Sequence, residues 1–63
     1  MPKLNKYSCR NITQHTEPEE IEAAYPELAA QFCAEGTQAS AGDKIAVGGL
    51  VYWVEVQYVI RQQ

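Results

Sequence analysis

The hydrophobic residues between Thr16 and Gly36 recur every three or four positions, which is the spacing of one face of an α-helix. Thr16 followed by Glu19 forms a capping-box pattern, and Gly36 is typical of the residue that ends a helix. We therefore expect a helix over residues 16–36. Its hydrophobic face would consist of Ile21, Ala24, Tyr25, Leu28, Ala29, Phe32 and Cys33.

Pro26 lies inside this expected helix, on its polar side. A proline in a helix interior removes one backbone hydrogen bond and costs ~3 kcal/mol. Either one helix bends at Pro26, or Pro26 opens the second of two short helices. The hydrophobic face continues across Pro26, and this favours a single kinked helix.

Three other segments have the character of β-strands. Residues 4–12 alternate between apolar and polar side chains, and residues 43–47 and 50–61 are rich in β-branched residues. Gly48 and Gly49 separate the last two segments. A Gly-Gly pair between two such runs predicts a two-residue hairpin turn, because glycine adopts positive φ angles without penalty.

These elements predict an α+β fold in which the final strand is central. Residues 50–61 are much longer than their hairpin partner, so their remaining length is free to pair with residues 4–12. We expect a β-α-β-β arrangement: a three-stranded antiparallel sheet in the order 1-3-2, with one Pro-kinked helix packed on one face. The chain, residues 1–63, would form a single compact domain.

The alternation within the final strand separates two sets of side chains. The set expected to contact the helix is Leu50, Tyr52, Val54, Val56, Tyr58 and Ile60. The other set mixes Val51, Trp53 and Val59 with three polar residues, Glu55, Gln57 and Arg61, on a face without a second layer. Large aromatic residues often anchor interfaces, so this face is expected to bind a partner or a second copy of the chain. The alternative is that a loop or the N-terminal arm covers it.

Charge is distributed unevenly along the chain, although the formal net charge is only −3. Residues 1–16 carry Lys3, Lys6 and Arg10 and no acidic residue. Residues 17–36 contain no Lys or Arg but six glutamates, which are Glu17, Glu19, Glu20, Glu22, Glu27 and Glu35. Binding to phosphate backbones depends on Lys and Arg, and the five in this chain argue against direct nucleic-acid binding. The acidic segment instead favours a basic protein surface as partner.

The residues do not indicate catalytic or metal-binding chemistry. His15 lies in a polar turn without an orienting partner for a catalytic triad, and the glutamates lie on a solvated face. Cys9, His15 and Cys33 lack the close spacing of zinc ligands. We expect a non-enzyme without metal or cofactor, in which Cys9 and Cys33 are buried free thiols.

Neither a membrane span nor a secretion signal is predicted. No segment approaches the ~20 apolar residues needed to cross a bilayer. The first residues also lack the continuous apolar core of a signal peptide. We therefore expect a protein located in the cytoplasm of a host bacterial cell.

In its small size, its acidity and its α/β organisation, the chain resembles the small acidic anti-CRISPR proteins of phages and mobile elements, particularly inhibitors of type I systems. This resemblance implies a non-enzymatic inhibitor that binds a DNA-handling Cas subunit, with carboxylates standing in for DNA phosphates. The residues that would carry the mimicry are Glu17, Glu19, Glu20, Glu22 and Glu27. The alternative is a structural or regulatory module that self-associates or binds a partner through the open sheet face around Trp53.

Overall fold

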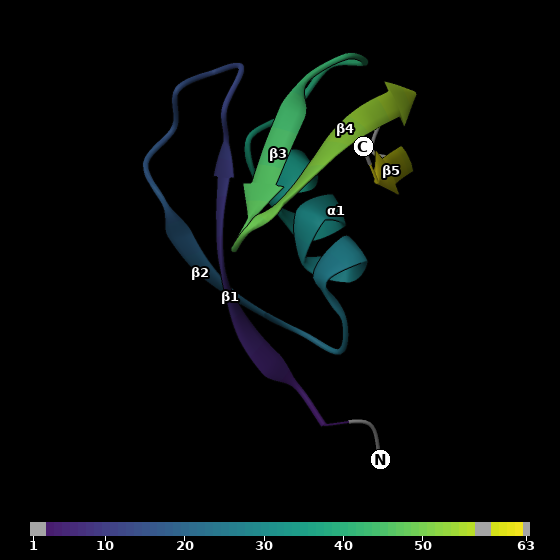
Figure 1. The fold of residues 1–63 in the computed structure, drawn as a ribbon. Coiled ribbons are helices and arrows are strands. Elements are labelled where there is room, and N and C mark those ends of the chain that lie inside the picture. The colour runs from purple at the N-terminus through teal and green to yellow at the C-terminus, as the bar shows by residue number, and fades with distance from the viewer. Residues whose placement is uncertain (1–2, 57–58, 63) are drawn as a thin grey trace.

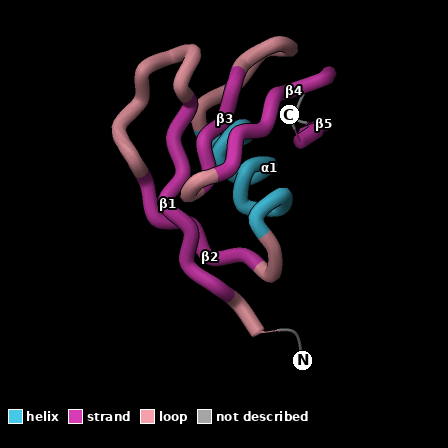
Figure 2. The backbone as a smooth tube through the Cα atoms, in the orientation of Figure 1, coloured by secondary structure: helices cyan, strands magenta, loops and turns pink. Residues whose placement is uncertain are grey.

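The computed structural model describes residues 3–56 and 59–62, which form one helix and one antiparallel sheet of five strands. Along the chain the elements are β1 (Asn5–Asn11), β2 (Glu19–Ala23), α1 (Pro26–Gly36), β3 (Lys44–Val47), β4 (Leu50–Val56) and β5 (Val59–Gln62). The strands lie in the order β2-β1-β3-β4-β5, and α1 covers one face of the sheet (Figures 1 and 2). The fold is α+β, but the prediction of a three-stranded sheet is wrong.

The predicted helix over residues 16–36 is correct only in its second half. Its first half contains β2, which pairs antiparallel with β1 so that Ile21 lies opposite Tyr7. Thr16 does not cap a helix, because its hydroxyl accepts a hydrogen bond from the Asn11 N–H at 2.8 Å. The five residues of β2 alternate polar and apolar positions well enough to form a strand. Pairing with β1 provides hydrogen-bond partners for their backbone N–H and C=O groups.

Pro26 stands in the first turn of α1, so the predicted kink is wrong. The alternative of two short helices is correct only in that Pro26 opens a helix, because the segment before it is the strand β2. A proline there loses no intrahelical hydrogen bond, and its fixed φ suits the first turn. The other end also differs from expectation. Gly36 has no positive φ, and Thr37 closes the helix with its hydroxyl donating to the Cys33 carbonyl at 2.9 Å.

The predicted final strand is divided into β4 and β5, which pair as a second hairpin with Val54 opposite Ile60. Gln57 and Tyr58, between them, lie outside the described residues. The predicted 1-3-2 order is also wrong, because β1 pairs with β3 rather than with β4. A strand has two edges, and those of β4 are occupied by β3 and β5. The predicted hairpin of β3 and β4 is confirmed.

The core lies between α1 and the sheet and is built largely from small side chains on the helix. The buried residues of α1 are Ala29, Ala30, Cys33 and Ala34. Alanines allow the helix to approach the sheet closely, where it meets Ile45, Val47, Tyr52 and Val54. Tyr25 and Phe32, which the sequence pattern assigned to the buried face, are 53% and 42% exposed.

A buried polar cluster holds two loops against the sheet, the one between β1 and β2 and the one between α1 and β3. The Asn11 side chain, which is fully buried, donates to the Asp43 carboxylate at 3.1 Å and to the Thr37 hydroxyl at 3.2 Å. The same carboxylate oxygen of Asp43 accepts from the Gln14 side chain at 3.0 Å and from the Ser40 N–H at 3.3 Å. These hydrogen bonds lower the pKa of Asp43, the Gln14 contact most strongly.

Candidate functional site

The sheet face opposite α1 is the first candidate surface. Residues that lie opposite each other in antiparallel strands share a face, so the register identifies its members. Trp53 is opposite Lys44 on β3 and opposite Arg61 on β5, and Arg10 is opposite Ala46. We use the name "open sheet face" for the following residues: Lys6, Ser8, Arg10, Glu20, Glu22, Lys44, Ala46, Val51, Trp53, Glu55 and Arg61.

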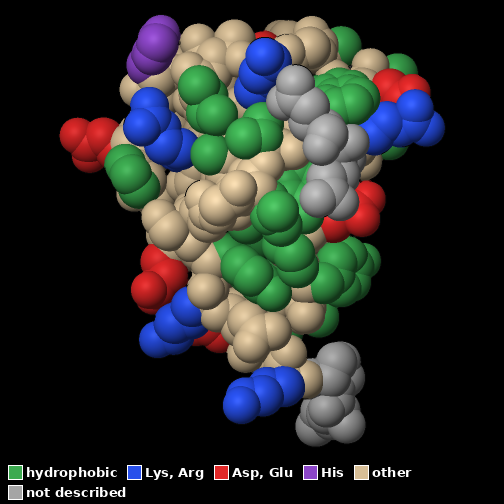
Figure 3. Space-filling model, in the orientation of Figure 1, with side chains coloured by type: hydrophobic (Ala, Val, Ile, Leu, Met, Phe, Trp, Pro, Cys, Tyr) green, Lys and Arg blue, Asp and Glu red, His purple; other side chains and the backbone are tan. Residues whose placement is uncertain are grey.

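The open sheet face gathers four of the five Lys and Arg residues of the chain, namely Lys6, Arg10, Lys44 and Arg61. In Figure 1 the sheet lies in front of α1, and Figure 3 shows from the same side that Lys and Arg surround an area containing hydrophobic side chains. Trp53, at the centre of one cross-strand row, is half-buried. The combination is a basic surface with an aromatic centre.

Two of these cations are paired with carboxylates on the same surface. Lys6 Nζ lies 3.8 Å from Glu20, and Arg61 Nε lies 3.4 Å from Glu55. Both pairs are exposed, and such pairs contribute little stability. Arg10 and Lys44 form no ion pair with any residue that the structure describes. The Nε of Arg10 is buried and has no hydrogen-bond partner among the described residues, although buried polar atoms are usually paired.

The glutamates predicted to form one acidic helix face are dispersed. Glu17 lies in the loop before β2, and Glu27 lies in the first turn of α1. Glu20 and Glu22 belong to the open sheet face, whereas Glu19 is opposite Cys9 on the side of the helix. All five side chains are exposed, but they belong to a loop, to both faces of β2 and to α1. The acidic helix face on which the sequence hypothesis depended is therefore not formed.

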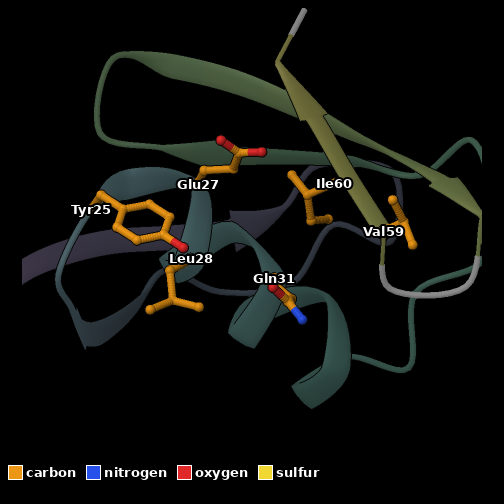
Figure 4. A pocket seen from close by; sticks show the side chains of 6 residues that line it. All are labelled: Tyr25, Glu27, Leu28, Gln31, Val59 and Ile60. Carbon is orange, nitrogen blue, oxygen red and sulfur yellow. The ribbon is translucent and has the colours of Figure 1, made fainter.

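A groove between α1 and β5 is the second candidate surface (Figure 4). It measures about 290 Å³ and is lined by Tyr25, Glu27, Leu28, Gln31, Val59 and Ile60. Val59 was expected beside Trp53 on the open sheet face, but it lines this groove instead. The register of β4 and β5 shifts between Val54 and Val56, which changes the alternation that the sequence pattern assumed.

Sequence reasoning placed Trp53 and Arg61 on one face, but it missed Lys44 and Arg10 as their neighbours and the whole groove. Arg61 shares its parity with Trp53 in the predicted final strand, so the sequence pattern already placed the two residues on one face. Lys44 and Arg10 lie on other strands, and their position near Trp53 can be inferred only once the register is known. The groove could not be predicted because it requires β5 to fold back against α1.

The thiols do not resemble reactive cysteines. Cys9 and Cys33 are both free and buried, as predicted. Burial raises the pKa of the Cys33 thiol to about 11, with smaller contributions from Cys9 and Glu19. Burial also raises the pKa of Cys9. Because the thiolate is the nucleophile, a raised pKa makes both thiols poor nucleophiles.

Within residues 3–56 and 59–62, no three His, Cys, Asp or Glu side chains gather as a metal site requires. His15 is exposed, in a turn where its φ is 56°. The 11 residues of α1 are too few for a membrane-crossing helix, and the described part of the chain offers no other candidate.

Fold and surfaces together define a small α+β domain with a curled antiparallel sheet and one exposed sheet face. Comparison with protein families, curated proteins and solved structures gives no match to this chain.

Proposed function

We propose that this protein is a non-enzymatic interaction module that binds an acidic segment of a partner protein through the open sheet face. The observation that carries the proposal is the position of Trp53 between Lys44 and Arg61, with Arg10 in the adjacent row. Trp and Arg are the residues most enriched among energetic hot spots of interfaces. A carboxylate from the partner would also pair with the Arg10 guanidinium, which forms no ion pair with a described residue.

A protein partner fits this surface better than a nucleic acid does. Nucleic-acid affinity depends on cations that are available to neutralise phosphates. Lys6 and Arg61 are already paired with carboxylates, and Glu22 adds a further negative charge. An acidic peptide segment needs only an apolar contact with Trp53 and the two cations of this face that form no ion pair with a described residue, Arg10 and Lys44. The two buried free thiols support a reducing compartment such as the cytoplasm as the place of action.

The test is affinity capture from a nuclease-treated bacterial lysate, followed by titration of the captured protein. Lys44→Glu reverses an exposed charge beside Trp53, and Trp53→Ala removes the aromatic contact. Each is expected to weaken binding about 30-fold, as for a hot-spot loss of about 2 kcal/mol. Lys3→Glu is the matched control, because it changes the net charge equally outside the sheet and should retain binding.

The proposal fails if Lys44→Glu and Lys3→Glu bind the captured protein equally well. It also fails if the wild-type protein captures nothing once nucleic acid has been removed. Circular dichroism of each variant establishes that a loss of binding is not a loss of fold. Lys44 is exposed, so its variant keeps the test meaningful even if Trp53→Ala unfolds the protein.

Inhibition of a type I CRISPR surveillance complex, by binding a basic DNA-handling subunit, is the second proposal. One observation supports it: Glu19 and Glu27 lie on the helix side and form no ion pair with any described residue. They are therefore available to a basic partner, whereas Glu20 is paired with Lys6.

The two sets of glutamates provide an internal comparison for this second proposal. Replacing Glu19 and Glu27 with Lys is expected to reduce inhibition of DNA binding by the type I complex at least about tenfold, because two attractive contacts become repulsive. Replacing Glu20 and Glu22 with Lys should have a smaller effect. If the wild-type protein and the Glu19/Glu27 variant inhibit equally well, the helix-side carboxylates do not contribute to inhibition.

A further inference from the structure

The free edge of the sheet at β5 lies directly beside α1. β5 is the last strand in the order β2-β1-β3-β4-β5, so one of its edges has no strand partner among the described residues. The sheet curls toward the helix on this side, and Figure 1 shows β5 set back from β4. An unpaired strand edge next to a helix is the arrangement in which many domains accept an extended peptide.

The direction of the free backbone groups follows from the bonds of β4. The Val54 N–H donates to the Asp43 carbonyl at 2.9 Å, and the Val54 carbonyl accepts from the Gly42 N–H at 2.7 Å. Both groups of Val54 therefore point away from β5. Because Ile60 lies opposite Val54, the alternation of an antiparallel ladder directs the N–H and carbonyl of Ile60 to the free edge.

The groove beside this edge can receive side chains. Val59 and Ile60 line it from β5, and Leu28 and Gln31 line it from α1 (Figure 4). Tyr25, the residue before α1, completes this side of the groove. Tyr25 and Val59 are 53% and 50% exposed, so the groove presents apolar surface to solvent. Its volume of about 290 Å³ lies near the lower end of ligand pockets, and it suits one or two side chains of a peptide.

We propose that an extended peptide segment of a partner protein adds to the sheet as a sixth strand beside β5. The peptide exchanges hydrogen bonds with the N–H and carbonyl of Ile60 and places alternate apolar side chains in the groove. Among the described residues that line the groove, Glu27 is the charged one, so a Lys or Arg of the peptide pairs with it. This site is separate from the open sheet face and would allow the protein to join two partners.

A second copy of the chain is a less suitable occupant than a peptide. Antiparallel pairing of two β5 strands around Ile60 would bring both Glu27 carboxylates to the same interface, where they repel each other. β5 has only four residues, so such a dimer would rest on few backbone bonds. The acidic groove instead complements a basic peptide.

The probe is a capped peptide of about eight residues with Val or Leu at alternate positions and Lys between them. In nuclear magnetic resonance, the chemical shifts of Ile60 are expected to change with added peptide until they saturate. The hydrogen exchange of the Ile60 amide is expected to slow on binding. A peptide of the same composition without the alternation should bind at least about fivefold more weakly, because its apolar side chains cannot all face the groove.

Two charge reversals on the same helix separate specific binding from general attraction. Glu27→Lys is expected to weaken peptide binding about fivefold to tenfold, because it replaces an ion pair with a repulsion. Glu35→Lys, also exposed on α1 but outside the groove, should change binding less than twofold at 150 mM salt, where such distant charges are screened. Equal effects of both variants would overturn the proposal.

Further outcomes would also overturn it. One is peptide binding that leaves the Ile60 amide exchange unchanged, since strand addition requires that N–H. Another is concentration-dependent dimerisation of the free protein with protection of Ile60, which would assign the edge to a second copy. Lys44→Glu should leave peptide binding intact, so that a failure of this proposal is distinguished from a failure of the open sheet face.

Discussion

Asp43 is the residue on which the arrangement of the loops depends most directly. It is 9% exposed, and one of its carboxylate oxygens accepts three hydrogen bonds. Hydrogen bonds to an ionised carboxylate are stronger than those between neutral groups, so the charged form is preferred in the folded protein. The loops that contain Gln14 and Ser40 are thus held to the sheet through one side chain.

The lowered pKa of Asp43 predicts a particular dependence of stability on pH. An unfolded aspartate has a pKa of about 3.9, and the folded protein releases this proton more readily. The unfolded state therefore binds more protons in this range, and the free energy of unfolding rises with pH. The contribution of Asp43 is complete above about pH 5 and is lost as the pH falls through 3.9 and then through the lower folded pKa.

Urea denaturation of the wild-type protein and of Asp43→Asn between pH 6 and pH 3 measures this contribution. Asparagine keeps an acceptor oxygen but does not titrate, so the variant should lose less stability on acidification. Parallel pH profiles of the two proteins would show that Asp43 does not contribute.

Pro26 decides the boundary between two elements that the sequence pattern joined. The apolar residues from Ile21 to Cys33 satisfy a helical period, yet the short segment Glu19–Ala23 also satisfies the period of a strand. Pairing with β1 then makes the strand the better choice, because it satisfies backbone groups that a proline inside a helix would leave unpaired.

The hairpin between β3 and β4 depends on Gly48 rather than on both glycines. Gly48 has a φ of 58°, whereas Gly49 has no positive φ, and an added Cβ would meet no atom within 4 Å at either position. Gly48→Ala should therefore lower the free energy of unfolding by about 1–2 kcal/mol through backbone strain alone. Gly49→Ala is the matched control and should change it by less. Equal losses in chemical denaturation would contradict this interpretation of the turn.

At the scale of the whole molecule, the curl of the sheet creates two surfaces with different chemistry. The face away from α1 presents Trp53 among cations, and the edge at β5 forms an apolar groove with Glu27. The net charge does not predict a basic face and an acidic groove, because cations that are distant in sequence come together only when their strands pair. A chain with a formal charge of −3 thus presents a basic surface on one side.

The sequence by itself determined the α+β class, strand β1, the hairpin of β3 and β4, the C-terminal half of the predicted helix and the burial of both thiols. These features depend on local periodicity, turn residues and hydrophobicity, which neighbouring residues specify. Only the tertiary structure decided that Glu19–Ala23 is a strand, that β5 folds back, and that β1 pairs with β3. Those outcomes depend on which strand edges are already occupied and on the register between distant segments. A hydrophobic pattern along the chain gives no information on either.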